Sequence, residues 1–169
     1  MKASFQINIA ITLSRNNMLD NDLIREADRR HVIQLFELFS ESPYDALDLI
    51  EAYSRTYSRI RADEGSEYHV LKQPINVYND ILRENYLEKT ESEEDQVILH
   101  WIAELYVYTR YEKGLSFREM IKTVSPEWLY KHFSPLHETS LKNAWEKAVY
   151  ILGKNRKECI LTGNNTASL

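Results

Sequence analysis

The spacing of apolar residues along this chain is that of amphipathic helices over most of its length. Over residues 20–40, apolar positions recur every three or four residues and define one broad face. The apolar face is widest over residues 93–113, where it is made by Val97, Ile98, Trp101, Ile102, Leu105 and Tyr108. A face of this width is typical of a helix that other helices surround, so we expect residues 93–113 to form the centre of a bundle.

Capping residues predict where the neighbouring helices begin. Ser42 can cap a helix over about 43–61, because a proline follows it and proline fits the first helical turn. Pro74 can start another helix, and Ser92, which three acidic residues follow, can cap the helix over 93–113.

The last third of the chain carries a second set of helix signals. Gly114 can take the left-handed conformation that ends a helix. Ser116 and Glu119 have the S-x-x-E spacing of a capping box. We expect the final helix over 140–152, with Gly153 ending it.

The segment 5–13 is the exception to the helical spacing. Its apolar residues alternate strictly with polar or small ones, which is the two-residue period of a half-buried strand. No second strand is evident to pair with it, so a buried first helix is the alternative. The expected fold is therefore all-α, a single-domain multi-helix bundle, with either a short N-terminal β-strand or a helix over 5–13.

The composition supports this fold class. The 169 residues include only 4 glycines and 4 prolines, which suits long helices better than many short strands joined by turns. The hydrophobic fraction of 43% and the charged fraction of 28% are ordinary for a globular protein. We expect one helical domain over 1–153 and a disordered C-terminal tail over 154–169, where the sequence is polar and non-periodic.

Charge and hydropathy restrict the partners and the compartment. The net charge of −5 argues against a surface built as a whole for nucleic acid, although a local basic patch stays open. The chain has no apolar run of the length that a membrane helix needs and no signal-peptide pattern. With Cys159 as its single cysteine, we expect a cytoplasmic protein that uses no membrane.

The sequence carries no motif for nucleotide, metal or catalytic chemistry. Its four glycines stand too far apart for a dinucleotide fingerprint or a P-loop. Its five histidines are scattered, and His137-Glu138 lacks the second histidine of H-E-x-x-H. We expect no cofactor, no metal and no catalytic residue, with an enzyme of unrecognised site kept as a second alternative because active sites assemble in space.

Aromatic and arginine residues point instead to protein contacts. The 11 tyrosines and 3 tryptophans are residues that, with arginine, commonly anchor interfaces. The candidate partner-binding residues are Arg55, Tyr57, Arg59, Tyr106, Arg110, Tyr111, His137 and Glu138. For the strip that begins at Arg55, a solvated helix face is the other interpretation, because acidic residues follow at once.

Residues 116–133 also resemble a helix-turn-helix, since a three-residue turn joins two short predicted helices. A DNA-binding transcriptional regulator is therefore the first alternative. The second helix offers only Lys131 as a firm cation, and an acidic residue lies near its start. Packing of both helices within the core is the favoured interpretation.

Three short motifs resemble a group of small, mostly uncharacterised helical bacterial proteins from toxin-antitoxin and mobile-element operons. The motifs are W-I-A-E-L-Y-V-Y at 101–108, L-S-F-R-E-M-I at 115–121 and L-Y-K-H-F-S-P-L-H-E at 129–138. The similarity covers about 100–148, and it departs from the group's pattern at Met120-Ile121 and at Phe133. The resemblance implies a cytoplasmic accessory or neutralising protein that acts by binding, with an ADP-ribosyltransferase-like toxin as one such target.

Our leading hypothesis is a non-catalytic protein-binding module, of the antitoxin, immunity or regulatory type, that neutralises another protein by direct contact. A cognate toxin is the expected partner, and a homodimer is also open. Within the resemblance, His137 and Glu138 attract most interest because they lie at a turn after Pro135. Their structural alternative is local hydrogen bonding and helix capping.

Overall fold

The structure, a computed structural model, describes the backbone of residues 2–90 and 94–163 and the side chains of residues 21–67, 69–90 and 94–154. The secondary-structure elements within these ranges are all helices: α1 (Lys2–Ser40), α2 (Ala46–Tyr53), α3 (Tyr57–Asp63), α4 (Glu67–Val70), α5 (Pro74–Glu84), α6 (Gln96–Lys113), α7 (Phe117–Thr123), α8 (Pro126–Lys131), α9 (Phe133–His137) and α10 (Leu141–Gly163). The prediction of an all-α, multi-helix fold is confirmed.

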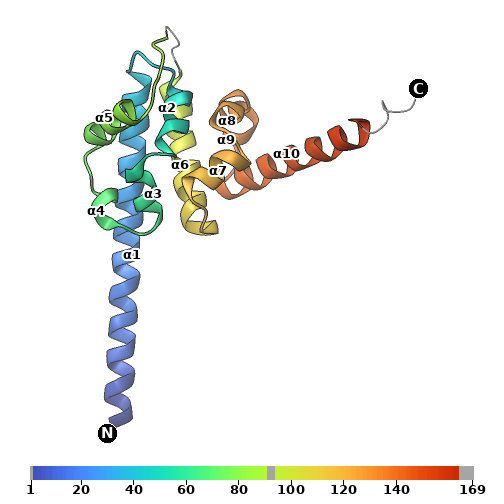
Figure 1. Ribbon diagram of the computed structural model, residues 1–169. Helices are drawn as coiled ribbons and strands as arrows, with labels where there is room; N and C mark the ends of the chain where they lie inside the picture. The colour runs from blue at the N-terminus through green and yellow to red at the C-terminus, as the bar shows by residue number, and fades with distance from the viewer. Residues whose placement is uncertain (1, 91–93, 164–169) are drawn as a thin grey trace.

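Helices α1 and α6 lie side by side and form the axis of the molecule (Figure 1). Helices α2, α4 and α5 contact α1, while α7, α8 and α10 contact α6. The central position expected for residues 93–113 is therefore the position of α6, which shares its role with α1.

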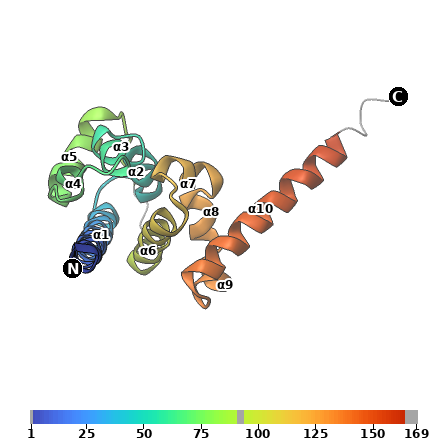
Figure 2. The same cartoon turned by 90° about the horizontal axis from the view of Figure 1, so that it is seen from below.

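Two helices extend beyond the bundle. The N-terminal half of α1 projects from one end of the molecule, and α10 leaves the body sideways (Figures 1 and 2). Within the described residues, no helix combines the length and the apolar character that a membrane crossing requires.

The core is formed mainly where α1, α2 and α6 meet. Its largest fully buried apolar side chains on these helices are Leu35, Phe36, Phe39, Leu49, Ile50, Leu99, Ile102, Leu105 and Tyr106. Edge-on aromatic contacts connect the layers, because the ring of Tyr53 lies 6.5 Å from Phe36 and 5.5 Å from Phe117. Full burial of a large apolar side chain contributes roughly 1.5–3 kcal/mol, so this cluster is the main source of stability.

The segment 5–13 lies within α1, so the strand alternative is wrong and the helix alternative holds. The physical reason is backbone hydrogen bonding. A lone strand leaves its N–H and C=O groups without partners, whereas a helix satisfies them internally. No glycine or proline occurs before Pro43 to interrupt that helix.

The helix predicted over 43–61 begins later than expected. Asp45, not Ser42, is the N-cap of α2, and its carboxylate accepts hydrogen bonds from the backbone N–H groups of Leu47 and Asp48 at 2.8 and 3.0 Å. A long-range contact explains the shift. The Pro43 carbonyl accepts a 3.0 Å hydrogen bond from the Thr90 N–H, which keeps this segment extended.

The same predicted helix is also divided in two. Helix α2 ends at Tyr53, and Thr56 caps α3 by accepting a 3.2 Å hydrogen bond from the Arg59 N–H. The Thr56 hydroxyl donates to the Tyr53 carbonyl at 2.8 Å, so its side chain satisfies both helix ends. The division turns Arg59 toward the interior of the protein.

Several local signals are confirmed. Pro74 starts α5, and Gly114 ends α6 with φ of 66°. Ser116 and Glu119 form the predicted reciprocal capping box at the start of α7.

Two predicted boundaries differ. Ser92 lies outside the described residues, and Asp95 is the N-cap of α6, accepting a 2.7 Å hydrogen bond from the Val97 N–H. At the C-terminus, α10 continues through Gly153 to Gly163, so residues 154–163 of the expected tail are helical. A single glycine lowers helix stability without forbidding the helix, which is why Gly153 does not end it.

Two glycines provide a matched test of these backbone assignments. Gly114→Ala is expected to destabilise the fold by about 1 kcal/mol, because a side chain at φ of 66° is strained even though no atom lies within 4 Å of the added Cβ. Gly153→Ala, in a helix and equally unobstructed, is expected to leave stability unchanged or raise it by up to about 1 kcal/mol. Urea unfolding of both variants measures the difference. A loss of stability in both would contradict the helical assignment at Gly153.

Candidate functional site

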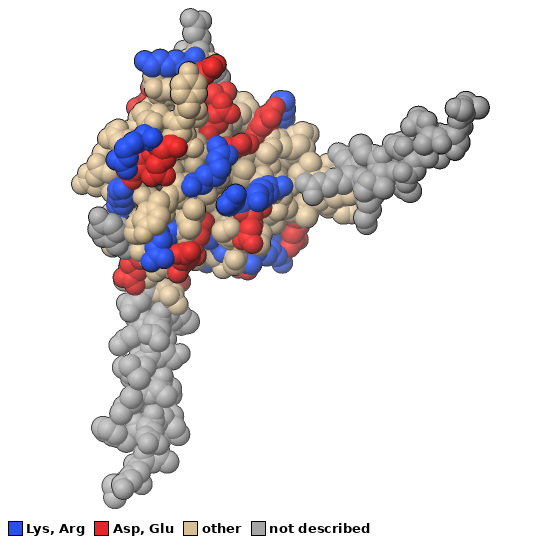
Figure 3. Space-filling view, in the orientation of Figure 1, with Lys and Arg blue, Asp and Glu red and all other residues tan. Residues whose placement is uncertain are grey.

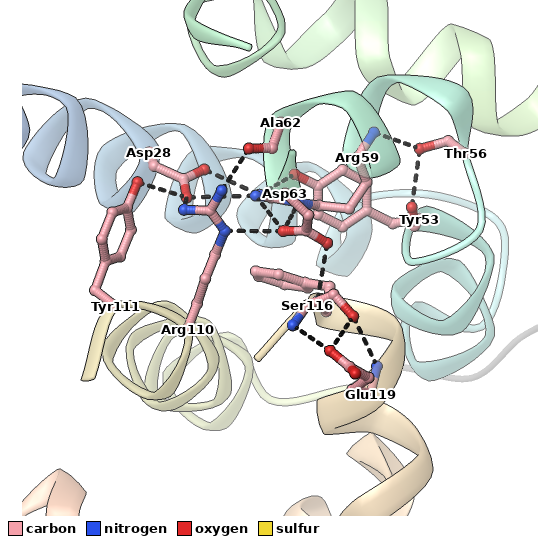
Figure 4. A network of polar contacts seen from close by, with 11 residues as sticks. Asp28, Tyr53, Thr56, Arg59, Ala62, Asp63, Arg110, Tyr111, Ser116 and Glu119 are labelled. Carbon is pink, nitrogen blue, oxygen red and sulfur yellow. Dashed lines mark hydrogen bonds and ion pairs between the residues drawn. The ribbon is translucent and has the colours of Figure 1, made fainter. Parts of the chain in front are cut away.

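A buried ion network connects α1, α3 and α6 (Figure 4). Its centre is Arg59 of α3, whose side chain is fully buried. The Arg59 guanidinium donates to Asp28 of α1 at 2.9 Å and to Asp63 at 2.7 and 3.0 Å. It also donates to the Tyr53 hydroxyl at 3.1 Å and lies 4.4 Å from the centre of the Phe117 ring.

Arg110 of α6 completes the network from the opposite side. Its Nε donates to Asp63 at 2.8 Å, and its Nη1 lies 3.4 Å from the Asp28 carboxylate. Its Nη2 donates to the backbone carbonyl of Ala62. Two arginines thus face two aspartates, and the buried charges compensate one another.

Backbone and hydroxyl groups occupy the remaining acceptor positions. The second oxygen of Asp63 accepts a 2.9 Å hydrogen bond from the Phe117 N–H, which attaches α7 to the network. The Tyr111 hydroxyl donates to Asp28 at 3.2 Å. Together with the Tyr53 contact, these bonds give the network a structural role that extends over the five helices α1, α2, α3, α6 and α7.

The electrostatic effects follow from burial and pairing. Burial alone would raise the pKa of Asp28, but Arg59 and Arg110 outweigh it, and the pKa lies below its ordinary value. Burial raises the pKa of Tyr53 to about 12. Burial also lowers the pKa of His31 to about 4, with Asp28 opposing the shift and Arg59 adding to it.

A polar cleft of about 530 Å³ opens beside the network between α3 and the start of α7. It is lined by Ser54, Ile60, Asp63, Glu64, Arg110, Gly114, Leu115, Ser116, Arg118 and Glu119. Two of its polar residues already have partners within the chain, since Asp63 accepts hydrogen bonds from two arginines and Ser116 bonds Glu119. Arg118 adds a further cation to the lining.

In the part of the chain that the structure describes, no group of three or more His, Cys, Asp or Glu side chains is arranged so that it could hold a metal ion. His100 and Glu104, four residues apart on α6, form a 3.5 Å contact of the kind expected for a helix-surface pair.

A second cavity, of about 520 Å³, has a different character and lies between α1, α6, α9 and α10. Its apolar lining is made by Val97, Trp101, Phe133 and Leu141, and its polar lining by Glu37, Gln96, His100, Glu104 and His137. A third cavity, of about 400 Å³, is lined by Gln34, Glu37, Leu38, Glu41, Gln73, Pro74, Ile75 and Gln96. The two share Glu37 and Gln96 and are therefore neighbours; we call the two cavities together the α5–α10 groove.

The aromatic residues of this groove leave one polar group without a partner. The rings of Trp101 and Phe133 meet edge-on at 5.4 Å, and Phe133 stacks on His137 at 4.2 Å. The indole Nε1 of Trp101 is buried and has no hydrogen-bond acceptor. A buried N–H group without an acceptor costs about 1–3 kcal/mol, and this one is enclosed by the chain itself.

Acidic side chains flank the apolar part of the groove. Glu37 is 39% exposed and lies 3.8 Å from His100. Glu104 is held by Arg29 of α1 through two hydrogen bonds, one of them 2.9 Å long. Glu37 and the exposed Glu41, which also lines the groove, are therefore the carboxylates that could meet a cation from another molecule.

The structure separates the candidate partner-binding residues predicted from the sequence. Arg59 and Tyr106 are buried, with 1% and 0% of their surface exposed, so the expectation that they contact a partner directly is wrong for both. Hydrophobic packing and ion pairing turn them inward, since the Tyr106 hydroxyl donates to the Val124 carbonyl at 2.8 Å. Arg110 and Tyr111 belong to the buried network.

The other four candidates remain on the surface. Arg55 lies 3.8 Å from Glu51, and Tyr57 is 63% exposed with its ring against His69. His137 lines the α5–α10 groove, and the exposed Glu138 follows it as the C-cap residue of α9. The structure does not gather these residues into one surface.

The unit at 116–133 corresponds to α7 and α8. Leu129 of α8 is buried, and Lys131, its expected DNA-contacting cation, forms a 2.6 Å ion pair with Glu127. On the face shown in Figure 3, positive and negative side chains are interspersed. Both observations favour packing over a role in reading DNA.

No protein-family model, curated protein or solved structure matches the chain.

The first prediction from this site concerns the ion network. Arg59→Met is expected to destabilise the protein by about 3–5 kcal/mol, because it leaves two buried carboxylates with one arginine. Arg61→Met is the matched control, because Arg61 forms an exposed pair with Glu64 and should cost less than about 1 kcal/mol. Denaturant unfolding compares the two, and equal losses would show that the network does not stabilise the fold.

The second prediction concerns pH. Because the pKa of His31 is about 4 in the folded chain and about 6.5 when unfolded, protonation favours the unfolded state. The stability contributed by neutral His31 is present above pH 6.5 and is lost as the pH falls toward 4, by about 2 kcal/mol between pH 7 and pH 5. His31→Gln should show a flatter pH dependence over that interval in thermal unfolding. An unchanged slope in this variant would contradict the assignment.

Proposed function

We propose that this chain is a protein-binding module that neutralises or regulates another protein by binding a segment of that protein in the α5–α10 groove. The observation that carries the proposal is the apolar part of the groove, where Val97, Trp101, Phe133 and Leu141 line one cavity and Val97 is 67% exposed. Apolar surface left open to solvent in this way is typical of a site that binds another protein.

The extent of the groove favours a polypeptide over a small molecule. Two neighbouring cavities share Glu37 and Gln96, and their linings include Ile75 of α5 and Leu141 of α10. Grooves of this kind bind amphipathic helices, whose apolar side chains fill successive pockets.

The order of chemical groups along the groove specifies the partner further. Apolar side chains lie at both ends, with Leu38 and Ile75 in one cavity and Trp101 and Phe133 in the other, and Glu37 lies at their junction. A complementary helix carries an apolar residue, then lysine or arginine, then a second apolar residue. We call this order the apolar–basic–apolar pattern.

The resemblance of residues 100–148 to proteins of toxin-antitoxin operons supports a toxin as the bound protein. It covers α6 to α10, the helices that contribute Trp101, Phe133, His137 and Leu141 to the groove. The proposed activity is therefore that of a cytoplasmic antitoxin or immunity protein, which blocks a toxin by direct contact and catalyses no reaction.

The test is co-expression with the products of the adjacent genes, followed by affinity measurement with the product that proves toxic. Val97→Asp, at a position 67% exposed in the groove, is expected to abolish protection and weaken binding at least tenfold, because the complex would bury a carboxylate against apolar groups. That factor corresponds to about 1.4 kcal/mol.

Leu71→Asp is the matched control, because Leu71 is 69% exposed and lies outside the groove. It should protect as well as the unaltered chain. If no adjacent gene product is toxic or binds, or if Val97→Asp protects fully, the proposal fails.

A further inference from the structure

We infer that the polar cleft between α3 and α7 is a second docking site, and that its occupant is an acidic segment of another polypeptide. The polar cleft and the α5–α10 groove share no lining residue. The inference therefore goes beyond the proposed function, because it concerns a different surface. Its partner also has the opposite charge to the basic segment proposed for the groove.

Arg118 is the charged group of the polar cleft that another molecule can reach. Apart from Arg118, every arginine whose side chain the structure describes forms an ion pair with a carboxylate. Arg118 is exposed, and it has no ion pair or side-chain hydrogen bond within the described part of the chain. Its guanidinium therefore keeps its donors for a group from outside.

The polar cleft also contains three carboxylates, and each has a partner within the chain. Asp63 belongs to the buried ion network. Glu64 pairs with Arg61, and Glu119 accepts hydrogen bonds from the N–H and O–H groups of Ser116 at 2.8 and 2.7 Å. Because these carboxylates are compensated locally, the unpaired charge of the polar cleft is positive.

Apolar surface accompanies this positive charge. Ile60 of α3 is 38% exposed, Leu115 is half-buried, and both line the polar cleft. At Gly114 the backbone is open, because no atom lies within 4 Å of the position that a Cβ would take. A partner chain can therefore approach closely and place an apolar side chain against Ile60 and Leu115.

This combination of groups favours a polypeptide over a nucleic acid or a free anion. A nucleic acid would bring a row of phosphates close to Glu64 and Glu119, where Arg118 is the one unpaired cation of the lining. A free anion would leave Ile60 and Leu115 uncovered. A glutamate or aspartate beside an apolar residue uses both features, because its carboxylate can accept two parallel hydrogen bonds from a guanidinium.

The walls of the polar cleft are fixed before a partner arrives. Asp63 of α3 accepts a 2.9 Å hydrogen bond from the Phe117 N–H of α7 and a 2.8 Å hydrogen bond from Arg110 of α6. Figure 4 shows these residues together with the capping box of Ser116 and Glu119. Since the site is already ordered, binding loses little conformational entropy, and a small contact can give a measurable affinity.

The experiment uses a short synthetic peptide as the probe, with glutamate between two leucines and with glycine and serine on either side. An NMR titration of the full chain records the methyl signals of Ile60 and Leu115 and the Nε–H signal of Arg118. These signals are expected to shift together, with a dissociation constant in the millimolar range. The signals of Val97 and Trp101, which line the groove, should stay in place.

Two further peptides carry glutamine or lysine in place of the glutamate. The unaltered chain should bind both at least fivefold more weakly than the glutamate peptide. In Arg118→Glu the order should reverse, with the lysine peptide bound at least fivefold more tightly than the glutamate peptide, because the ion pair is rebuilt with opposite polarity.

Arg30→Glu is the matched control. The Arg30 side chain is 66% exposed, belongs to α1 and pairs with Glu26, and it does not line the polar cleft. This variant should keep the peptide preference of the unaltered chain. Equal effects of Arg30→Glu and Arg118→Glu would assign the binding to the overall charge of the protein and reject the site.

Four other results would overturn the inference. A lysine peptide that the unaltered chain prefers would show that the carboxylates of the polar cleft dominate it. Methyl signals of Ile60 and Leu115 that stay in place at several millimolar glutamate peptide would show that no such segment binds. Equal shifts with inorganic phosphate would assign the site to a free anion. Self-association that Arg118→Glu abolishes would assign it to a second copy of the chain.

The outcome is separable from that of the proposed function. Val97→Asp should leave the dissociation constant of the glutamate peptide unchanged, because Val97 lines the groove and not the polar cleft. Peptide binding by a chain that protects against no toxin would support this inference and reject the proposed function. Protection by a chain that binds no glutamate peptide would do the reverse.

Discussion

The structure depends on the burial of Arg59 between Asp28 and Asp63. A guanidinium removed from water must keep its charge compensated and its donors paired, and here Asp28, Asp63 and Tyr53 meet that requirement. Because these partners come from three helices, the arginine fixes how α1, α2 and α3 are placed. Arg110 adds α6 to the same cluster, and the Phe117 N–H adds α7. Apolar packing stabilises the bundle, and the ion network specifies which of its packings is adopted.

The distinction between the polar cleft and the α5–α10 groove follows from the same principle. Both are of similar size, but the cleft is lined mainly by polar residues, of which Asp63 and Ser116 are satisfied inside the chain. The groove instead has the apolar lining of Val97, Trp101, Phe133 and Leu141, and Val97 is largely exposed. Exposed apolar surface is a better sign of a binding surface than volume, so it directs attention to the groove.

Sequence patterns predicted the features that depend on neighbouring residues. The Gly114 helix end and the capping box at Ser116 and Glu119 need only local backbone chemistry, and both are confirmed. The start of α2 was misplaced because it depends on Thr90, which lies far away in sequence. Arg59 was assigned to a basic strip for the same reason. Its partner Asp28 lies on α1, and the spacing of residues within one helix does not predict a contact with another helix.

The groove was beyond sequence analysis in a similar way. Trp101 was predicted as part of the wide apolar face of the central helix, and of that face Ile102 and Leu105 are buried while Val97 is 67% exposed. Which of these residues stays near the surface depends on where α9 and the start of α10 lie beside the helix. His137, a predicted candidate, does line the groove, but neither Glu37 nor Gln96 carries a local signal that distinguishes it from other polar helix residues.

Helices α1 and α6 each contribute to both the ion network and the groove. Helix α1 supplies Asp28 to the network and Glu37 to the groove, and α6 supplies Arg110 to the network and Trp101 to the groove. A molecule that bridges the two helices at the groove binds the folded chain and not the unfolded one, and it stabilises the fold by mass action. The lifetime of the chain in a cell that degrades unfolded proteins would then be set by how much of its partner is present. Because the binding surface spans the two axial helices, the amount of this chain in the cell would then depend on the fraction of it that is bound to the partner.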